Sequence, residues 1–225
     1  MIKAEVAQKD DLTGLYNRKG FLERFSEMLT EAKVSPHEAP LSLTLMDVDK
    51  FSIINDQYGH VAGDHVLVAV AKAIQAHVSA DALVGRYGGD EFVIVYPGME
   101  REQAFLNMEK IRQEISQQQL AVSDGSTIQG IPISGGVASF PMDGRSENEL
   151  WRKADQALYR AKVSGRNQIR LAYEERMVPK TTHYTQTQLE RLSKLAEERG
   201  VNEADLLREA MDDFLTKYGV NDIET

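Results

Sequence analysis

The sequence predicts an α/β fold with a mainly antiparallel or mixed central sheet and flanking helices. One observation is composition: of 225 residues, 42% are hydrophobic and 27% are charged, the balance of an ordinary globular protein. Another is that helical and strand periodicities alternate between residues 10 and 170. A third is a glycine turn between two short β-rich runs, which is typical of a hairpin.

The expected elements of the first half follow from these periodicities. Phe21–Ala32 and Val61–Val78 space their apolar residues three and four apart, which predicts helices. Leu41–Val48 (LSLTLMDV) begins by alternating apolar and polar residues, so we expect a strand. Leu83–Tyr87 and Phe92–Tyr96 are the strands of the hairpin, and the two glycines between them permit the positive φ angles of a tight turn.

The second half continues the alternation. Gln103–Ile115 has helical spacing, and Ile128–Ser139 is strand-like, with two adjacent glycines that indicate a bulge or a close backbone approach. Glu147–Val163 is predicted to be a helix with its C-cap at Gly165. Ile169–Ala172 is the last expected strand of this region.

The pattern changes from residue 173 onward. A polar, extended stretch precedes a helix at Gln188–Arg199, and after Gly200 a second helix is expected with Asn202 as its N-cap. So small a unit buries too little apolar surface to be stable alone, and oligomerisation would remedy this. We therefore expect one domain at 1–172 and an oligomerising unit at 173–225.

Composition and charge exclude several classes of function. The absence of cysteine excludes disulfides, cysteine-ligated metals and thiol nucleophiles. The net charge of −9 argues against a general polyanion binder. The N-terminus lacks the apolar stretch of a signal peptide, and Val66–Val78 is too short to span a bilayer. We expect a cytoplasmic protein that has no membrane partner.

Two acidic clusters carry the chemistry that the sequence predicts. Asp47 and Asp49 end a predicted strand, and Asp90 and Glu91 lie on the hairpin turn. Strand ends and hairpin tips can meet at one sheet edge, where several carboxylates would need a cation. Oxygen ligands suit Mg²⁺ or Mn²⁺, which favours metal-assisted phosphoryl or nucleotidyl transfer. The alternative is that these acids are ordinary solvated turn-formers.

The segment Arg86–Phe92 (RYGGDEF) resembles the signature of the GGDEF family, the diguanylate cyclases. Further segments match, in order, the family's entry motif, its metal- and guanine-binding segment, its penultimate core strand and its last helix. These segments are Asp10–Arg18, Asp47–Asp64, Ser134–Val137 and Ala154–Asn167. The resemblance covers residues 8–172 and implies a palm-like domain. In that family, two domains each hold one GTP and condense the pair into cyclic di-GMP.

The resemblance implies roles for the acidic clusters. Asp47 and Asp90 would bind the metal ions, with the carbonyl of Val48 assisting. Either Asp90 or Glu91 would help to deprotonate the attacking 3′-hydroxyl, and the sequence leaves both alternatives open.

The resemblance also implies a nucleotide-binding set. Asn55 and Asp64 would hydrogen-bond guanine, and His60 between them would shape the pocket. Lys162 and Arg166 are four residues apart at a predicted helix end, hence on one face, and would neutralise phosphate charge.

Two glycines have a steric role in this scheme, and two positions depart from the family pattern. A side chain at Gly88 or Gly89 would keep the backbone from approaching the nucleotide. Ser52 stands where the family often has lysine, which removes one cation near the phosphates. Ser79 and Ala82 replace the arginine and aspartate of the family's inhibitory product site, so we expect no such site.

The C-terminal segment Lys180–Tyr218 resembles a ribbon–helix–helix domain of small bacterial repressors. The matching segments are Thr181–Tyr184, Leu189–Leu192, Leu195–Ala196, Gly200–Asn202 and Leu206–Phe214. In that fold two chains pair their strands into a ribbon that enters the DNA major groove, so a homodimer is implied and double-stranded DNA is a candidate partner. Residues 173–225 hold 7 basic against 12 acidic residues, a net of −5, which is poor for phosphate affinity. A plain helical-hairpin dimeriser is the alternative.

The leading hypothesis is therefore an active diguanylate cyclase. Its C-terminal domain is the candidate for dimerisation, regulation and DNA binding. The alternative is a catalytically weak GGDEF module that serves as the nucleotide-sensing domain of a DNA-binding regulator. The intact acidic clusters favour the enzyme over this module, and they argue against a pure scaffold.

Overall fold

The computed structural model describes residues 8–34, 39–122, 125–172 and 182–199, together with single positions of the last helical segment between 203 and 218. The chain divides into two compact units, Met1–Glu175 and Arg176–Thr225. Each unit is described by itself below.

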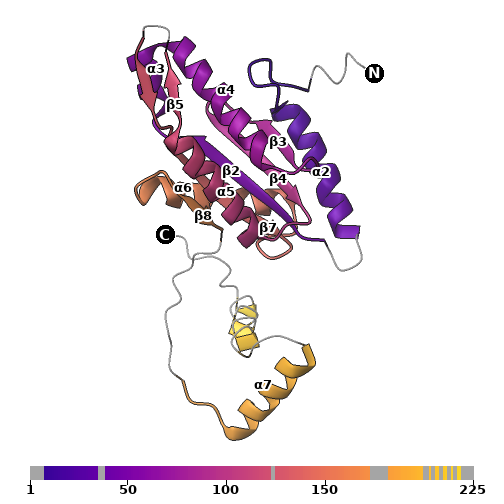
Figure 1. Ribbon diagram of the computed structural model, residues 1–225. Helices are drawn as coiled ribbons and strands as arrows, with labels where there is room; N and C mark the ends of the chain where they lie inside the picture. The colour runs from indigo at the N-terminus through magenta and orange to yellow at the C-terminus, as the bar shows by residue number, and fades with distance from the viewer. Residues whose placement is uncertain are drawn as a thin grey trace. The chain divides into compact units, whose positions relative to one another are not determined.

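The first unit is built on a six-stranded mixed sheet within its described residues (Figure 1). In sheet order the strands are β1 (Tyr16–Asn17), β3 (Leu83–Arg86), β4 (Glu91–Pro97), β2 (Leu41–Val48), β7 (Ile133–Phe140) and β8 (Ile169–Leu171). The two outer pairs, β1 with β3 and β7 with β8, are parallel, and the three inner pairs are antiparallel. The predicted α/β class and the β3–β4 hairpin are confirmed.

Helices cover both faces of this sheet. On one face α4 (His60–His77) and α5 (Arg101–Gln117) pack in a core with Met46 and Val48 of β2. On the other face α2 (Arg18–Val34) and α6 (Glu147–Val163) pack in a core with Leu43 and Leu45. Every residue of β2 is therefore buried, because this central strand has helices over both of its faces. A short helix that the periodicities did not predict, α3 (Phe51–Tyr58), follows β2.

The single strand predicted at Ile128–Ser139 is wrong, because the chain breaks it into β6 (Thr127–Gln129) and β7. Gly130 has a φ of 69°, and its amide donates to the carbonyl of Gln118 at 2.8 Å. The chain thus turns back onto the end of α5, and β6 pairs instead with β5 (Gln119–Ala121) in a separate ribbon.

The close backbone approach expected from the glycines of β7 is confirmed. A Cβ atom on Gly136 would overlap the backbone of Ala154 and Leu158, so only glycine lets α6 lie this close to the sheet. The helix begins with a capping box, in which the Ser146 hydroxyl accepts from the Glu149 amide and the Glu149 carboxylate accepts from the Ser146 amide.

The placement of Lys162 and Arg166 on one helix face is wrong. The helix α6 ends at Val163, and Gly165 then takes a φ of 117°, outside any helix. Arg166 follows with a φ of 64°, so it lies in a left-handed turn beyond the helix.

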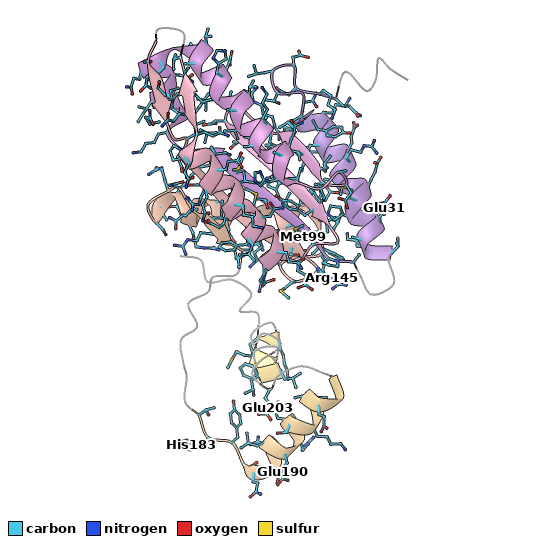
Figure 2. All side chains as sticks on the ribbon, viewed as in Figure 1. Glu31, Met99, Arg145, His183, Glu190 and Glu203 are labelled. Atoms are coloured by element: carbon cyan, nitrogen blue, oxygen red, sulfur yellow. The ribbon has the colours of Figure 1, made fainter. Side chains whose placement is uncertain are left out.

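The second unit contains α7 (Gln186–Arg199), which begins two residues before the predicted start. Thr185 and Gln188 stabilise this start, since the Thr185 hydroxyl accepts from the Gln188 amide and the Gln188 side chain accepts from the Thr185 amide. The carboxylate of Glu203, labelled in Figure 2, accepts a hydrogen bond from Ser193 of α7. Residues 182–185 form no strand, and the predicted ribbon residue Thr181 and N-cap Asn202 lie outside the described residues.

Among the helices that the structure describes, none has the length and apolar character needed to span a membrane.

Candidate active site

The candidate site lies where the central strand β2 ends. Asp47 pairs in register with Glu91 of β4 on one side and with Ser134 of β7 on the other. The amide of Val48 donates to the carbonyl of Asp90 at 3.1 Å. The pairing of β2 with the hairpin thus brings the two acidic clusters to one edge of the sheet.

Asp47 is a nearly buried carboxylate that already binds a cationic side chain. It is 9% exposed, and the ammonium Nζ of Lys162 lies 2.8 Å from its Oδ2. Burial raises the pKa of the Asp47 carboxyl; the charges of Asp90 and Asp49 also raise it, while the bond and charge of Lys162 oppose this. Negative charge is therefore concentrated at this strand end, and the Lys162 ammonium partly compensates it.

Asp49, the second aspartate at the end of β2, differs from Asp47 in its burial and its hydrogen-bond partners. Asp49 is 2% exposed, and its carboxylate accepts hydrogen bonds from the Ser134 hydroxyl at 2.9 Å and the Asn167 amide at 2.8 Å. Asp49 is therefore buried and hydrogen-bonded within the protein, although its charge still acts on the neighbouring Asp47.

The glycine turn does not use the left-handed angles that the sequence suggested. Neither Gly88 nor Gly89 has a φ in that region. A Cβ atom on Gly88 would lie 2.6 Å from Oε2 of Glu91. The glycine therefore leaves space for this exposed carboxylate in its present position. The turn closes through the Tyr87 amide, which donates to the carbonyl of Glu91 at 2.8 Å.

An ion pair supports the turn from the side of the N-terminal segment. The guanidinium of Arg86 donates to the carbonyl of Gly89 at 2.7 Å and lies 3.2 Å from a carboxylate oxygen of Asp10. Burial alone would raise the pKa of Asp10, but hydrogen bonds from Thr13 and the charge of Arg86 hold it below its ordinary value of 3.8. No role was predicted for Asp10 or Arg86 from the sequence, although they lie in the segments Asp10–Arg18 and Arg86–Phe92 that match the family.

The predicted guanine-binding residues lie on α3 and α4. Asn55 of α3 faces Gly63 of α4 so closely that a Cβ atom on Gly63 would overlap its side chain. Oδ1 of Asn55 is buried and has no hydrogen-bond partner within the described structure. His60 and Asp64, also on α4, are exposed. None of the predicted three joins the hydrogen bonds at the end of β2.

The strand end fits a hard divalent cation better than a soft one. Asp47 and Asp90 offer carboxylate oxygens and Val48 offers a carbonyl oxygen, and the ammonium of Lys162 shows that Asp47 accepts a cation. No group of three or more acidic or histidine side chains converges in the part of the chain described. Mg²⁺ typically takes few protein ligands together with substrate phosphates, so this donor set suits it.

Two family models match the chain. Residues 7–168 match the model described as "Diguanylate cyclase, GGDEF domain". Residues 178–219 match the ribbon–helix–helix domain model.

Curated relatives share the first of these regions. The response regulator PleD of Caulobacter vibrioides is 36% identical over 165 residues, which is 73% of this chain and 36% of PleD. A diguanylate cyclase of Vibrio cholerae is 37% identical over 163 residues, 72% of this chain and 49% of that protein. The chain therefore spans less than half the length of either relative.

Solved structures agree with the fold. The GGDEF domain of DgcB from Caulobacter crescentus, crystallised in complex with c-di-GMP, superposes with a TM-score of 0.70 at 32% identity. That match covers 75% of this chain and 94% of the DgcB domain.

The ion pair under the glycine turn predicts a pH dependence of stability. Because the pKa of Asp10 is lowered in the folded chain, its contribution is complete above about pH 4 and is lost as the pH falls through its folded pKa. Asp10→Asn should lower the free energy of unfolding at pH 7 by roughly 0.5–1 kcal/mol, typical of a partly exposed pair. Urea unfolding at pH 7 and pH 3 measures this, and the difference from wild type should shrink at pH 3.

The exposed neighbour provides the control for this prediction. Asp11→Asn makes the same chemical change beside Asp10 and should leave the unfolding free energy near that of wild type. A deficit of Asp10→Asn that is equally large at both pH values would contradict the electrostatic explanation.

Proposed function

Because the chain belongs to the GGDEF family of diguanylate cyclases, we propose that it condenses two molecules of GTP into cyclic di-GMP. The observation that carries the proposal is the convergence of Asp47, Val48 and Asp90 at the end of β2, with Lys162 bound to Asp47. This is an arrangement of carboxylates and a cation suited to triphosphate chemistry.

We propose that Asp47, Asp90 and the Val48 carbonyl hold Mg²⁺ or Mn²⁺. A divalent ion, when bound, neutralises triphosphate charge. The raised pKa of Asp47 supports this assignment, since burial and the neighbouring carboxylates leave negative charge for a cation to compensate. Lys162 would then share its ammonium between Asp47 and a phosphate oxygen.

In the proposed reaction, the 3′-oxygen of one GTP bonds to the α-phosphorus of the other, and the bond to the leaving diphosphate breaks. Asp90 or Glu91 takes the 3′-hydroxyl proton. Glu91 is exposed and lines the same surface hollow as Lys162, which supports its access to substrate. A second such step closes the ring. Arg166 would contribute a further positive charge to the phosphates.

Guanine recognition is proposed for Asn55 and Asp64, with His60 shaping the pocket. The buried, unpartnered Oδ1 of Asn55 supports this, because an orphaned polar group is costly unless a ligand or water satisfies it. Gly88 and Gly89 would let the backbone of the turn approach the nucleotide. Ser79 and Ala82 offer no guanidinium or carboxylate, so we propose no product inhibition through them.

The second unit is proposed to form a homodimer that brings two cyclase domains together. Apolar side chains of its helices are exposed in the single chain: Leu189 by 43%, Leu195 by 39%, Met211 by 58% and Phe214 by 57%. A second copy of the chain would bury them. The family-model match supports double-stranded DNA as a further partner, while the net charge of −5 in residues 173–225 argues for weak phosphate affinity.

Turnover tests the proposed function. Full-length protein with GTP and Mg²⁺ should form cyclic di-GMP, measured by chromatography. Asp47→Asn, Asp90→Asn and Glu91→Gln should each reduce the rate by at least about 100-fold, as for the loss of a metal ligand or general base. Asp81→Asn, an exposed acid before β3, is the matched control. Wild-type protein that binds GTP without forming product would instead support the nucleotide-sensing module.

The contact between Gly63 and Asn55 predicts a loss of guanine selectivity. In Gly63→Ala, the new Cβ would displace the Asn55 amide, which can swing away at little cost to folding. The KM for GTP should rise about three- to tenfold, the worth of one neutral hydrogen bond. Steady-state kinetics with GTP and ATP would measure this, together with thermal unfolding.

Asn55→Ala is the partner variant for this measurement. The double variant should be no worse than either single one, because both remove the same contact. Additive losses would show that Gly63 acts on the nucleotide by another route.

The exposed apolar residues of α7 predict concentration-dependent activity. Leu189→Glu combined with Leu195→Glu should convert a dimer to a monomer in light scattering. Specific activity should fall at low protein concentration and recover in part at high concentration, because a tethered pair has an effective concentration on the order of millimolar. Met142→Glu, which changes an exposed apolar residue of the first unit, is the control. A double variant that stays dimeric and fully active would remove this face from the mechanism.

A further inference from the structure

The turn that follows α6 has an unusual backbone. Gly165, Arg166 and Asn167 have consecutive φ angles of 117°, 64° and 47°. The last two are not glycines, and side chains rarely adopt this left-handed region. Such residues persist where their surroundings hold them, and they concentrate at functional sites.

The buried carboxylate of Asp49 holds this turn from the side of the sheet. Its Oδ2 accepts from the Asn167 amide at 2.8 Å, and the Ser134 hydroxyl binds the same carboxylate at 2.9 Å. The guanidinium Nε of Arg166 lies 4.0 Å from Oδ1, and half of the Arg166 side chain is exposed. Asp49 therefore contacts both non-glycine residues of this left-handed turn, Arg166 and Asn167.

Helix α5 holds the same turn from the other side. The guanidinium of Arg112 donates to Oδ1 of Asn167 at 3.2 Å and pairs with Glu109 at 2.8 Å. The carboxylate of Glu109 accepts from the amide of Ile169 at 3.1 Å. Two independent sets of contacts thus fix the backbone on which Arg166 stands.

We propose that Asp49 is a positioning residue: it holds the 165–167 turn so that the Arg166 guanidinium is presented to the triphosphate at the end of β2. The inference rests on the proposed function, since Arg166 needs an anionic substrate to act on. Asp49 itself has no role as a metal ligand in this scheme, because Ser134 and Asn167 already occupy its oxygens. In Asp49→Asn a single acceptor oxygen is left for the two donors, Ser134 and Asn167, and Arg166 loses its electrostatic partner, so the turn relaxes and the guanidinium is no longer directed.

The test compares Asp49→Asn with Asp143→Asn in the full-length chain. Asp143 is a matched control because its side chain is 1% exposed, pairs with Arg101 at 2.9 Å and accepts from the Ser139 amide at 2.8 Å. Asp143 follows the C-terminal end of β7, whereas Ser134, the partner of Asp49, lies near its start. Ser134→Ala removes one hydrogen-bond donor to Asp49 but keeps the charge of Asp49. It replaces Asp49→Asn as the test variant if Asp49→Asn does not fold.

Two readouts separate this proposal from the proposed function. The first is the Kd for 3′-deoxy-GTP with Mg²⁺, an analogue that lacks the attacking hydroxyl and cannot react. The second is amide hydrogen exchange of residues 165–169 in the absence of nucleotide, which needs no activity.

Asp49→Asn and Arg166→Ala should each raise the Kd about tenfold. The double variant should match Arg166→Ala within about twofold, since coupled residues are non-additive. Exchange in the turn should be faster in Asp49→Asn and unchanged in Asp143→Asn. Ser134→Ala should shift both readouts in the same direction by less.

An unchanged Kd, wild-type exchange in the turn, or additive losses in the double variant would each overturn the role of Asp49. Wild-type protein that fails to bind the analogue would overturn the proposed function. The exchange measurement would still decide whether Asp49 holds the turn.

Discussion

The close packing of α6 against β7 is the constraint on which the candidate site depends. At Gly136 the two backbones approach so closely that no side chain fits between them. Leu158 lies at this contact, and one helical turn further along α6 is Lys162. On β7, Ser134 lies two residues before Gly136 and pairs with Asp47 of β2. A larger residue at position 136 would push α6 outward and separate Lys162 from Asp47.

Asp47 and Asp49, at the end of β2, have the same side chain but different surroundings, and they therefore differ in what they can bind. Asp47 stays close to other carboxylates, and burial raises its pKa, so it remains a site that gains from a cation. Asp49 is more deeply buried, and neutral donors from Ser134 and Asn167 satisfy it. A buried carboxylate without such bonds would cost several kcal/mol, so its partners are part of the fold. The difference arises from what β7 and the 165–167 turn place beside each residue.

Periodicity predicted the long helices because each has a wide apolar face on one side of the sheet. Periodicity missed α3 because none of the residues Phe51–Tyr58 is buried. It joined β6 to β7 because apolar residues continue on both sides of Gly130, where the chain turns. The motifs indicated the acidic clusters, but no local pattern shows that Arg86 reaches Asp10 or that Asn167 reaches Asp49. Those contacts join residues far apart in the sequence and depend on the finished sheet.

Gly88 and Gly89 are glycines for different physical reasons. The turn needs no left-handed angle, because Arg86 and the Tyr87 amide fix its shape. At Gly88 a Cβ atom would lie 2.6 Å from Oε2 of the exposed Glu91 side chain, so a larger residue there would require this carboxylate to move. At Gly89 no described atom lies within 4 Å of the missing Cβ, so the fold gives no reason for glycine there. The proposed nucleotide gives one, because its close approach to the backbone would require that space to stay empty.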